Sequence, residues 1–200
     1  MTLDTTNKKP KCSEEDDYES DLPDADTEQV KESLFEDRKI LLNEPITENI
    51  MYSVWQPIEQ LIKLDSVSPI TLYINSCGGD AYASLFISSY LLQSKTPIHT
   101  VVTGIAFSGG ALISLSGHKR FAYKYSTYML HLPKSSSDDM TDSKNLISQA
   151  KGIEMLDADI FDLLLTQTKM SKKMIRKKLS VDWYLSPSEA LKYGIVDTIF

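Results

Sequence analysis

Short apolar runs alternate with glycine-containing turns through the middle of the chain. Residues 70–74 and 98–102 have the continuous apolar character of strands that are buried on both faces. Each run leads into a turn with paired glycines and then into an apolar helical stretch, which covers residues 81–92 after the first strand. A strand, a tight turn and a helix thus occur twice. This order predicts an α/β domain of crossover units, with ligands bound outside the carboxyl ends of the strands.

The remaining pattern predicts further elements around this centre. Residues 40–42 and 195–199 are expected to form an opening and a closing strand, and two short strands are expected at residues 120–123 and 128–130. Thr47 suits the N-cap of a helix whose apolar face holds Ile50, Val54, Ile58 and Leu61, and Pro57 is expected to kink or break that helix. The stretch Ser186-Pro187-Ser188-Glu189 has the N-cap, first-turn proline and capping-box glutamate of another helix, which Gly194 would end.

A long amphipathic helix is predicted over residues 143–168. Leu146, Ala150, Ile153, Ile160 and Leu164 recur at helical spacing within it. A domain this small cannot cover so long a helix, so we expect part of its apolar face to meet another subunit. Packing of the whole helix inside the domain core is the alternative.

Charge is distributed unevenly along the 200 residues. Residues 1–37 hold 13 acidic and 4 basic residues, a balance of −9, whereas the rest of the chain holds 15 acidic and 17 basic residues, a balance of +2. Residues 1–29 are too acidic and too poor in apolar side chains to fold, so we expect a disordered tail before a single domain that covers residues 30–200. The nearly neutral body lacks the basic face that nucleic-acid binding requires.

Two cysteines, Cys12 and Cys77, do not form a disulfide framework or a metal-ligand set in a chain of this size. The polar first residues are unlike a secretory signal, and no apolar run is long enough to span a bilayer. These features predict a soluble protein in the cytoplasm.

Three histidines are available to activate a nucleophile. His99 lies inside a predicted strand and His118 lies in a polar turn, so a structural and a solvated role are expected for them. His131 ends an apolar strand at the point where a loop begins, which suits a general base. The local pattern alone still favours a structural role for His131.

Ser108 follows a predicted strand and precedes Gly109-Gly110 at the start of a helix. A serine hydroxyl there would project at a helix N-terminus, and the Gly109 amide is placed to point at a developing oxyanion. Gly78-Gly79 after the earlier strand is a candidate for a second amide donor. A tight turn before a helix is the competing explanation for Gly78-Gly79, and glycines are common after a strand, so the Ser108 segment alone is a weak signal.

Four segments together resemble a known family. They are residues 72–79 (LYINSCGG), 104–111 (GIAFSGGA), 128–133 (YMLHLP), and 182–190 with 193–197 (DWYLSPSEA and YGIVD). From Arg38 to Phe200, and in this order, the chain resembles the Clp protease proteolytic subunit (ClpP) family of serine peptidases. It departs from the family pattern at Cys77, where proline is usual, and at Ile105, Phe107 and Gly109, where glutamine, alanine and methionine are usual. Such divergence suits a specialised paralogue or a phage-encoded relative.

The resemblance implies a fold and a set of roles. The fold is the ClpP/crotonase-like α/β fold of repeated β-β-α units with a long protruding handle helix. Carried over by position, Ser108 is the nucleophile, His131 the general base and Asp182 the residue that orients the base, while the Gly79 and Gly109 amides form the oxyanion hole. The chain would be a subunit of an ATP-dependent serine endopeptidase that cleaves unfolded polypeptides inside an oligomeric chamber.

The resemblance also implies partners. Seven subunits would form a ring, with two rings stacked into a tetradecamer as in the family's usual assembly. An AAA+ unfoldase such as ClpX, ClpA or ClpC would use ATP to feed the ring, and the chain itself would need no cofactor and no metal. The glycine-rich segment that helps to join rings is replaced by residues 134–139, and the usual apolar docking pocket holds Thr71, Gln93 and Thr103. These polar residues would weaken burial of an unfoldase's apolar loop. Two alternatives stay open: a non-catalytic ring subunit of the same family and a crotonase-type acyl-thioester enzyme.

Overall fold

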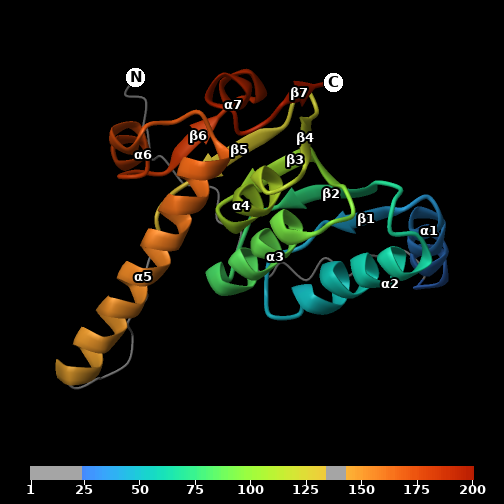
Figure 1. Cartoon of the computed structure of the whole chain (residues 1–200), viewed down its shortest axis with the longest axis horizontal. Helices are drawn as coiled ribbons and strands as arrows, with labels where there is room; N and C mark the ends of the chain where they lie inside the picture. The colour runs from blue at the N-terminus through green and yellow to red at the C-terminus, as the bar shows by residue number, and fades with distance from the viewer. Residues whose placement is uncertain (1–23, 134–142) are drawn as a thin grey trace, which may run out of the picture.

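The computed structural model describes residues 24–133 and 143–200. A mostly parallel sheet forms its centre, in the order β1-β2-β3-β4-β7, with β5 paired to β3 and β6 paired to β5 (Figure 1). Only the β5–β6 pair is antiparallel among the described strands. The strands are β1 (Lys39–Leu42), β2 (Ile70–Ser76), β3 (Ile98–Phe107), β4 (Lys119–Ala122), β5 (Thr127–Leu130), β6 (Trp183–Leu185) and β7 (Thr198–Ile199). The predicted α/β class is confirmed.

Strand β3 divides the sheet because its two halves have different neighbours. Its first half pairs with β4 from His99 to Val102, and its last residues pair with β5 from Ile105 to Phe107. The strand continues five residues beyond its predicted end at Val102. Asn75 contributes to this continuation, because its side-chain oxygen accepts a hydrogen bond from the Ile105 amide at 3.0 Å, where the β2–β3 register shifts.

The helices pack around this sheet. They are α1 (Asp24–Glu36), the π-helical turn η1 (Met51–Trp55), α2 (Gln56–Leu64), α3 (Ala81–Gln93), α4 (Gly109–Leu115), α5 (Ser143–Gln167), α6 (Lys172–Lys178) and α7 (Pro187–Tyr193). Helices α2 and α3 lie on one side of the strands, and α5 projects from the body (Figure 1). The core between these layers includes Leu72 and Ile74 of β2, both of which are fully buried.

The helix predicted to open at Thr47 is divided into two parts. Ile50, Val54 and Ile58 are buried as predicted. The backbone stays helical across the junction before Pro57, where the π-type hydrogen bonding of η1 changes to the α-type bonding of α2, so the hydrogen-bond pattern changes there but the helix does not break. The change of pattern coincides with proline, which has no amide N–H to donate to the turn before it.

The start of the fold differs from the prediction. Helix α1 begins at Asp24, inside residues 1–29, which were expected to be disordered. Its C-terminal part is held because Phe35 packs against the core. A helix anchored at one end by tertiary packing can extend beyond the anchored residues. The rest of the predicted tail, residues 1–23, lies outside the described residues, as do residues 134–139.

Two elements near the C-terminus were not predicted. Helix α6 has one buried residue, Ile175, among five basic ones, so it shows no apolar stripe. Strand β6 has only three residues. By contrast, α7 has both hydrogen bonds of the predicted capping box, and Gly194 ends it in the left-handed conformation.

Candidate active site

Ser108 lies at the junction between β3 and α4. Its backbone has φ 51° and ψ −117°, a conformation that non-glycine residues rarely adopt. The turn is fixed from both sides, because the Ser108 amide donates to the Met129 carbonyl at 2.7 Å and its carbonyl accepts from Leu112 at 3.1 Å. Backbone strain at a sharp strand-to-helix turn is typical of an exposed nucleophile.

His131 and Asp182 lie beside this serine because of strand pairing. Leu130 pairs with Trp183 in the antiparallel β5–β6 ladder, so the next residues outward, His131 and Asp182, are neighbours. His131 Nε2 lies 2.8 Å from Ser108 Oγ, and His131 Nδ1 lies 3.8 Å from Asp182 Oδ1. The two side chains of this second pair are 18% and 23% exposed. The structure therefore brings together all three residues that the sequence singled out.

The glycine turn after β2 lies against the Ser108 turn. Gly78 has φ 88°, and a Cβ added to it would lie 2.5 Å from the Phe107 carbonyl oxygen and 2.9 Å from Ser108 Cβ. Gly79 has φ 149°. Only residues without a side chain fit here, and Gly79 and Gly109 line one cavity beside Ser108.

Ile46 orients Gly79. The Ile46 amide donates to the Gly78 carbonyl at 2.8 Å, and the Ile46 carbonyl accepts from the Asp80 amide at 2.7 Å. In such a parallel bridge the intervening residue directs its own N–H and C=O away from the partner strand. The Gly79 amide thus faces away from Ile46, and Gly79 lines the cavity that contains Ser108.

Ser76 holds the same turn from inside. Its side chain is 1% exposed, and its hydroxyl donates to the Glu44 carbonyl at 2.6 Å and accepts from the Gly78 amide at 3.2 Å. Sequence reasoning did not single out Ile46 or Ser76. The signal available in the sequence for Ser76 was a polar residue at the end of an apolar strand, next to a paired-glycine turn. No local signal marks Ile46.

A cavity of about 340 Å³ opens beside the three residues. Gly79, Ser108, Gly109 and His131 form its polar side. Apolar residues line the rest of it: Ala81, Leu112, Pro133, Ile153, Leu156 and Ile160, with Tyr82 and Asp80 at the rim of α3. The cavity suits a ligand that places an apolar group next to the serine hydroxyl.

The other two histidines lie elsewhere. His99 is partly buried against Phe121, with ring centroids 6.1 Å apart, and burial lowers its pKa. His118 is exposed as predicted, but both its ring nitrogens lie near backbone groups of Ile98 and Ser94. Neither ring meets the Ser108 site.

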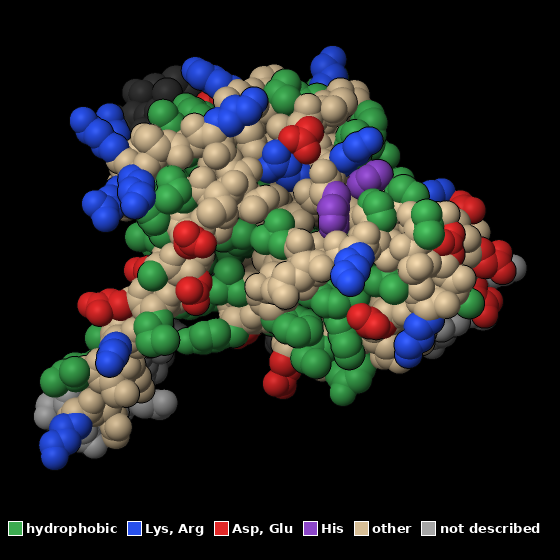
Figure 2. Space-filling view, viewed as in Figure 1, with side chains coloured by type: hydrophobic (Ala, Val, Ile, Leu, Met, Phe, Trp, Pro, Cys, Tyr) green, Lys and Arg blue, Asp and Glu red, His purple; other side chains and the backbone are tan. Residues whose placement is uncertain are grey.

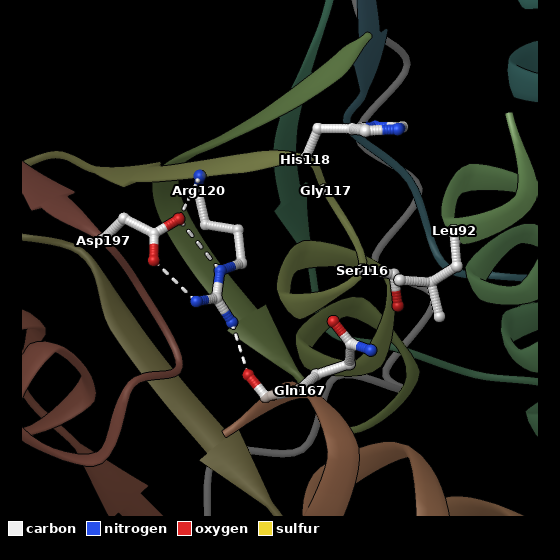
Figure 3. Close-up of a pocket in the computed structure, with 7 residues that line it drawn as sticks. All are labelled: Leu92, Ser116, Gly117, His118, Arg120, Gln167 and Asp197. Carbon is white, nitrogen blue, oxygen red and sulfur yellow. Dashed lines mark hydrogen bonds and ion pairs between the residues drawn. The ribbon is translucent and has the colours of Figure 1, made fainter. Parts of the chain in front are cut away.

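A second cavity, of about 310 Å³, lies beside His118 (Figure 3). The Arg120 guanidinium points across it and binds both carboxylate oxygens of Asp197, at 2.6 and 3.1 Å, and the Gln167 carbonyl at 2.7 Å. These bonds join β4 to the end of α5 and to the segment before β7. The Arg120 contacts therefore have a structural role.

Over residues 24–133 and 143–200, no group of three or more His, Cys, Asp or Glu side chains is arranged to hold a metal ion. No helix in this part of the chain has the length and apolar character needed to cross a bilayer.

A serine hydroxyl in hydrogen-bonding distance of an imidazole, with a carboxylate on the far side of that ring and glycine amides nearby, is the arrangement of serine hydrolases. Comparison with known proteins agrees with this class. The family model described as Clp protease matches residues 23–200. The chain belongs to the Clp protease family.

Individual relatives cover most of the chain. The ATP-dependent Clp protease proteolytic subunit of Deinococcus radiodurans is 32% identical over 171 residues, which are 83% of this chain and 81% of that protein. Proteolytic subunit 1 of Prochlorococcus marinus is 34% identical over 172 residues, covering 84% and 85%. Among solved structures, a ClpP1 mutant from Listeria monocytogenes superposes with a TM-score of 0.76 at 29% identity, covering 86% of this chain and 95% of that one.

Proposed function

We propose that this chain is the proteolytic subunit of an ATP-dependent Clp-type protease, a serine endopeptidase that cleaves unfolded polypeptides. The observation that supports the proposal most directly is the 2.8 Å contact between Ser108 Oγ and His131 Nε2, beside a cavity that glycine amides border. Family membership gives the reaction class. Ser108, His131 and Asp182 are the catalytic triad of the proposal, and the Gly79 and Gly109 amides are its oxyanion hole.

The proposed cycle uses these groups in order. Ser108 Oγ attacks the peptide carbonyl carbon while His131 Nε2 takes the hydroxyl proton. The carbonyl oxygen becomes an oxyanion, which the Gly79 and Gly109 amides stabilise; one such donor typically contributes about 3 to 4 kcal/mol. His131 then gives its proton to the leaving amine, which leaves an acyl-enzyme. His131 finally activates a water molecule that hydrolyses the ester and restores Ser108.

Asp182 acts on the imidazole in this scheme. His131 carries a positive charge whenever it holds the serine proton, and the Asp182 carboxylate lies 3.8 Å from the other ring nitrogen. The carboxylate would stabilise that charge and hold the ring with Nε2 toward the serine.

The proposal includes assembly into a heptameric ring, and stacking of two rings into a tetradecamer is its extension. Helix α5 supports a contact with another copy, because Leu146, Ile147 and Met155 are 53%, 71% and 63% exposed along it. Figure 2 shows apolar side chains at the surface of this projecting helix. So large an exposed apolar surface favours burial in an interface.

An AAA+ unfoldase such as ClpX, ClpA or ClpC is the proposed partner that would use ATP. Three rings support a docking surface for an apolar loop: Phe200 stacks on Phe121 with centroids 5.2 Å apart and meets Tyr123 at 5.9 Å. Thr103 on β3 follows Val102, whose carbonyl accepts from the Tyr123 amide, so this polar residue lies next to the ring cluster and reduces its apolar character. Unfoldase affinity would therefore be modest.

The two other functions considered are less well supported. A non-catalytic ring subunit has no need for a strained serine beside a histidine, yet Ser108 is both strained and in contact with His131. A crotonase-type enzyme likewise does not need this pair.

Peptide hydrolysis tests the proposal. The wild-type protein should cleave a short fluorogenic peptide with an apolar residue before the scissile bond, and Ser108→Ala should remove this activity. As a control, Ser66→Ala removes the same hydroxyl oxygen from an exposed serine and should leave the rate unchanged. Hydrolysis by Ser108→Ala at the wild-type rate would reject the assignment, and native mass spectrometry of both proteins would measure the assembly.

A further inference from the structure

The two turns that carry the candidate oxyanion amides are joined through one buried side chain, that of Ser84. Ser84 lies in the first turn of α3 and is 0% exposed. Its hydroxyl donates to the Asp80 carbonyl at 2.6 Å, one residue after Gly79. The side chain therefore connects at one end to the turn that holds the first oxyanion amide.

Ser84 also occupies the space beside the second amide. A Cβ added to Gly109 would overlap the Ser84 hydroxyl oxygen and lie 2.9 Å from Ser84 Cβ. The next atom, Ile46 Cδ1, is 3.2 Å away at the end of a flexible side chain. The φ of Gly109 lies outside the left-handed region, so the backbone itself would accept alanine. What excludes a side chain at position 109 is the presence of Ser84.

We propose that Ser84 is a positioning residue that sets the spacing of the Gly79 and Gly109 amides and makes glycine obligatory at position 109. This inference rests on the proposed function, because the two amides matter only if an oxyanion forms between them. Ser84 touches no substrate in this scheme. It acts through the two backbone turns, which it holds in contact.

The geometry predicts a graded series of variants. Gly109→Ala forces the α4 turn away from Ser84 and moves its amide, so kcat should fall by about 100-fold or more, as when one oxyanion donor is lost, with KM changed little. Ser84→Ala in that background removes the overlapping oxygen but leaves Cβ 2.9 Å from the new methyl group, so recovery should be partial. Ser84→Gly removes both atoms and should restore kcat to within about tenfold of the wild-type value.

The experiment uses the wild type, Gly109→Ala and the two double variants. For each it measures kcat and KM for a fluorogenic peptide and the inhibition constant of a peptide aldehyde. The aldehyde forms a hemiacetal whose oxygen would occupy the oxyanion hole, so its affinity should fall and recover in parallel with kcat/KM. A role limited to folding would change the amount of active protein but not this affinity. Gly152→Ala is the matched control, because a Cβ there has nothing within 4 Å.

Two results would overturn the role of Ser84: a Gly109→Ala variant as active as the wild type, or a Ser84→Gly/Gly109→Ala variant no more active than Gly109→Ala. If Gly109→Ala does not fold, rescue is read as recovery of folded, active protein in the Ser84→Gly double variant, and its absence counts against the proposal. These failures leave Ser108-dependent hydrolysis by the wild type intact. Failure of the proposed function would instead appear as a wild-type protein without any such hydrolysis.

Discussion

Replacement of Asp182 by asparagine tests the weakest contact of the candidate triad. The carboxylate oxygen and His131 Nδ1 are 3.8 Å apart, which is within ion-pair range but longer than a hydrogen bond. Asparagine has nearly the same size and cannot carry the charge. The substitution therefore removes the electrostatic contribution with little change in packing.

The distance sets the expected magnitude. At 3.8 Å and an effective dielectric constant of about 20, a carboxylate attracts the imidazolium formed during the reaction by about 4 kcal/mol. Both side chains keep roughly a fifth of their surface exposed, and water lowers the attraction to about 2 to 3 kcal/mol. This corresponds to a kcat that is about 30- to 150-fold lower. Loss of the correct imidazole tautomer adds to the effect and can bring it to about 10⁴-fold.

The assay is hydrolysis of a fluorogenic peptide at saturating and limiting concentrations, with thermal melting of the same samples. We expect Asp182→Asn to lower kcat and to leave KM and the melting temperature nearly unchanged, because the residue contacts the base and not the substrate. An Asp182→Asn protein that keeps more than about a third of the wild-type kcat would show that the carboxylate does not stabilise the imidazolium.

Three further predictions concern stability. Burial would by itself raise the pKa of Asp197, but the hydrogen bonds and charge of Arg120 outweigh it and hold the pKa below its usual range. The pair therefore stabilises the fold above the unfolded-state pKa of about 3.9, and this stabilisation is lost as pH falls through the lower folded-state pKa. Asp197→Asn should melt at a lower temperature than the wild type at pH 7 and should lose less stability on acidification. Equal acid sensitivity of the two proteins would contradict this. Ser186→Ala removes the N-cap hydroxyl of α7 and should lower the free energy of unfolding in urea by about 1 kcal/mol, whereas no change would mean that the cap contributes nothing. Leu72→Ala opens the fully buried core and should lower the same free energy by about 2 to 5 kcal/mol, while Val67→Ala, at a site 79% exposed, should stay within about 0.5 kcal/mol; equal effects would contradict the assigned core.

Elements with a buried face were predictable from local pattern. Ile70, Leu72 and Ile74 alternate along β2 and share its buried face, while Thr71 and Tyr73 between them are only partly buried. The capping box of Ser186 and Glu189 marks a helix start within four residues. Helix α6 and strand β6 were missed for the opposite reason. Ile175 is the only buried residue of α6, and β6 exists because its three residues pair with β5, which no local pattern records.

The candidate site was predictable only in part. Ser108 and His131 stand at strand ends beside glycine or a loop, and this local context marks them as candidates. Asp182 has no such context, and only the family resemblance selected it. Its position depends on the β5–β6 register, which places it opposite His131. The contact between Ser84 and Gly109 joins two helices that are adjacent only in the folded chain, so no sequence pattern shows it.

The central claim is that His131 activates Ser108 as a nucleophile. Fluorophosphonate labelling followed by peptide mass spectrometry measures this directly, because the reagent marks only a serine whose proton a neighbouring base removes. The account predicts one adduct per subunit on Ser108 of the wild-type protein, and a rate of labelling that is strongly reduced by His131→Ala. Folded wild-type protein that carries no adduct on Ser108, or equal labelling of that serine without the imidazole, would contradict the account.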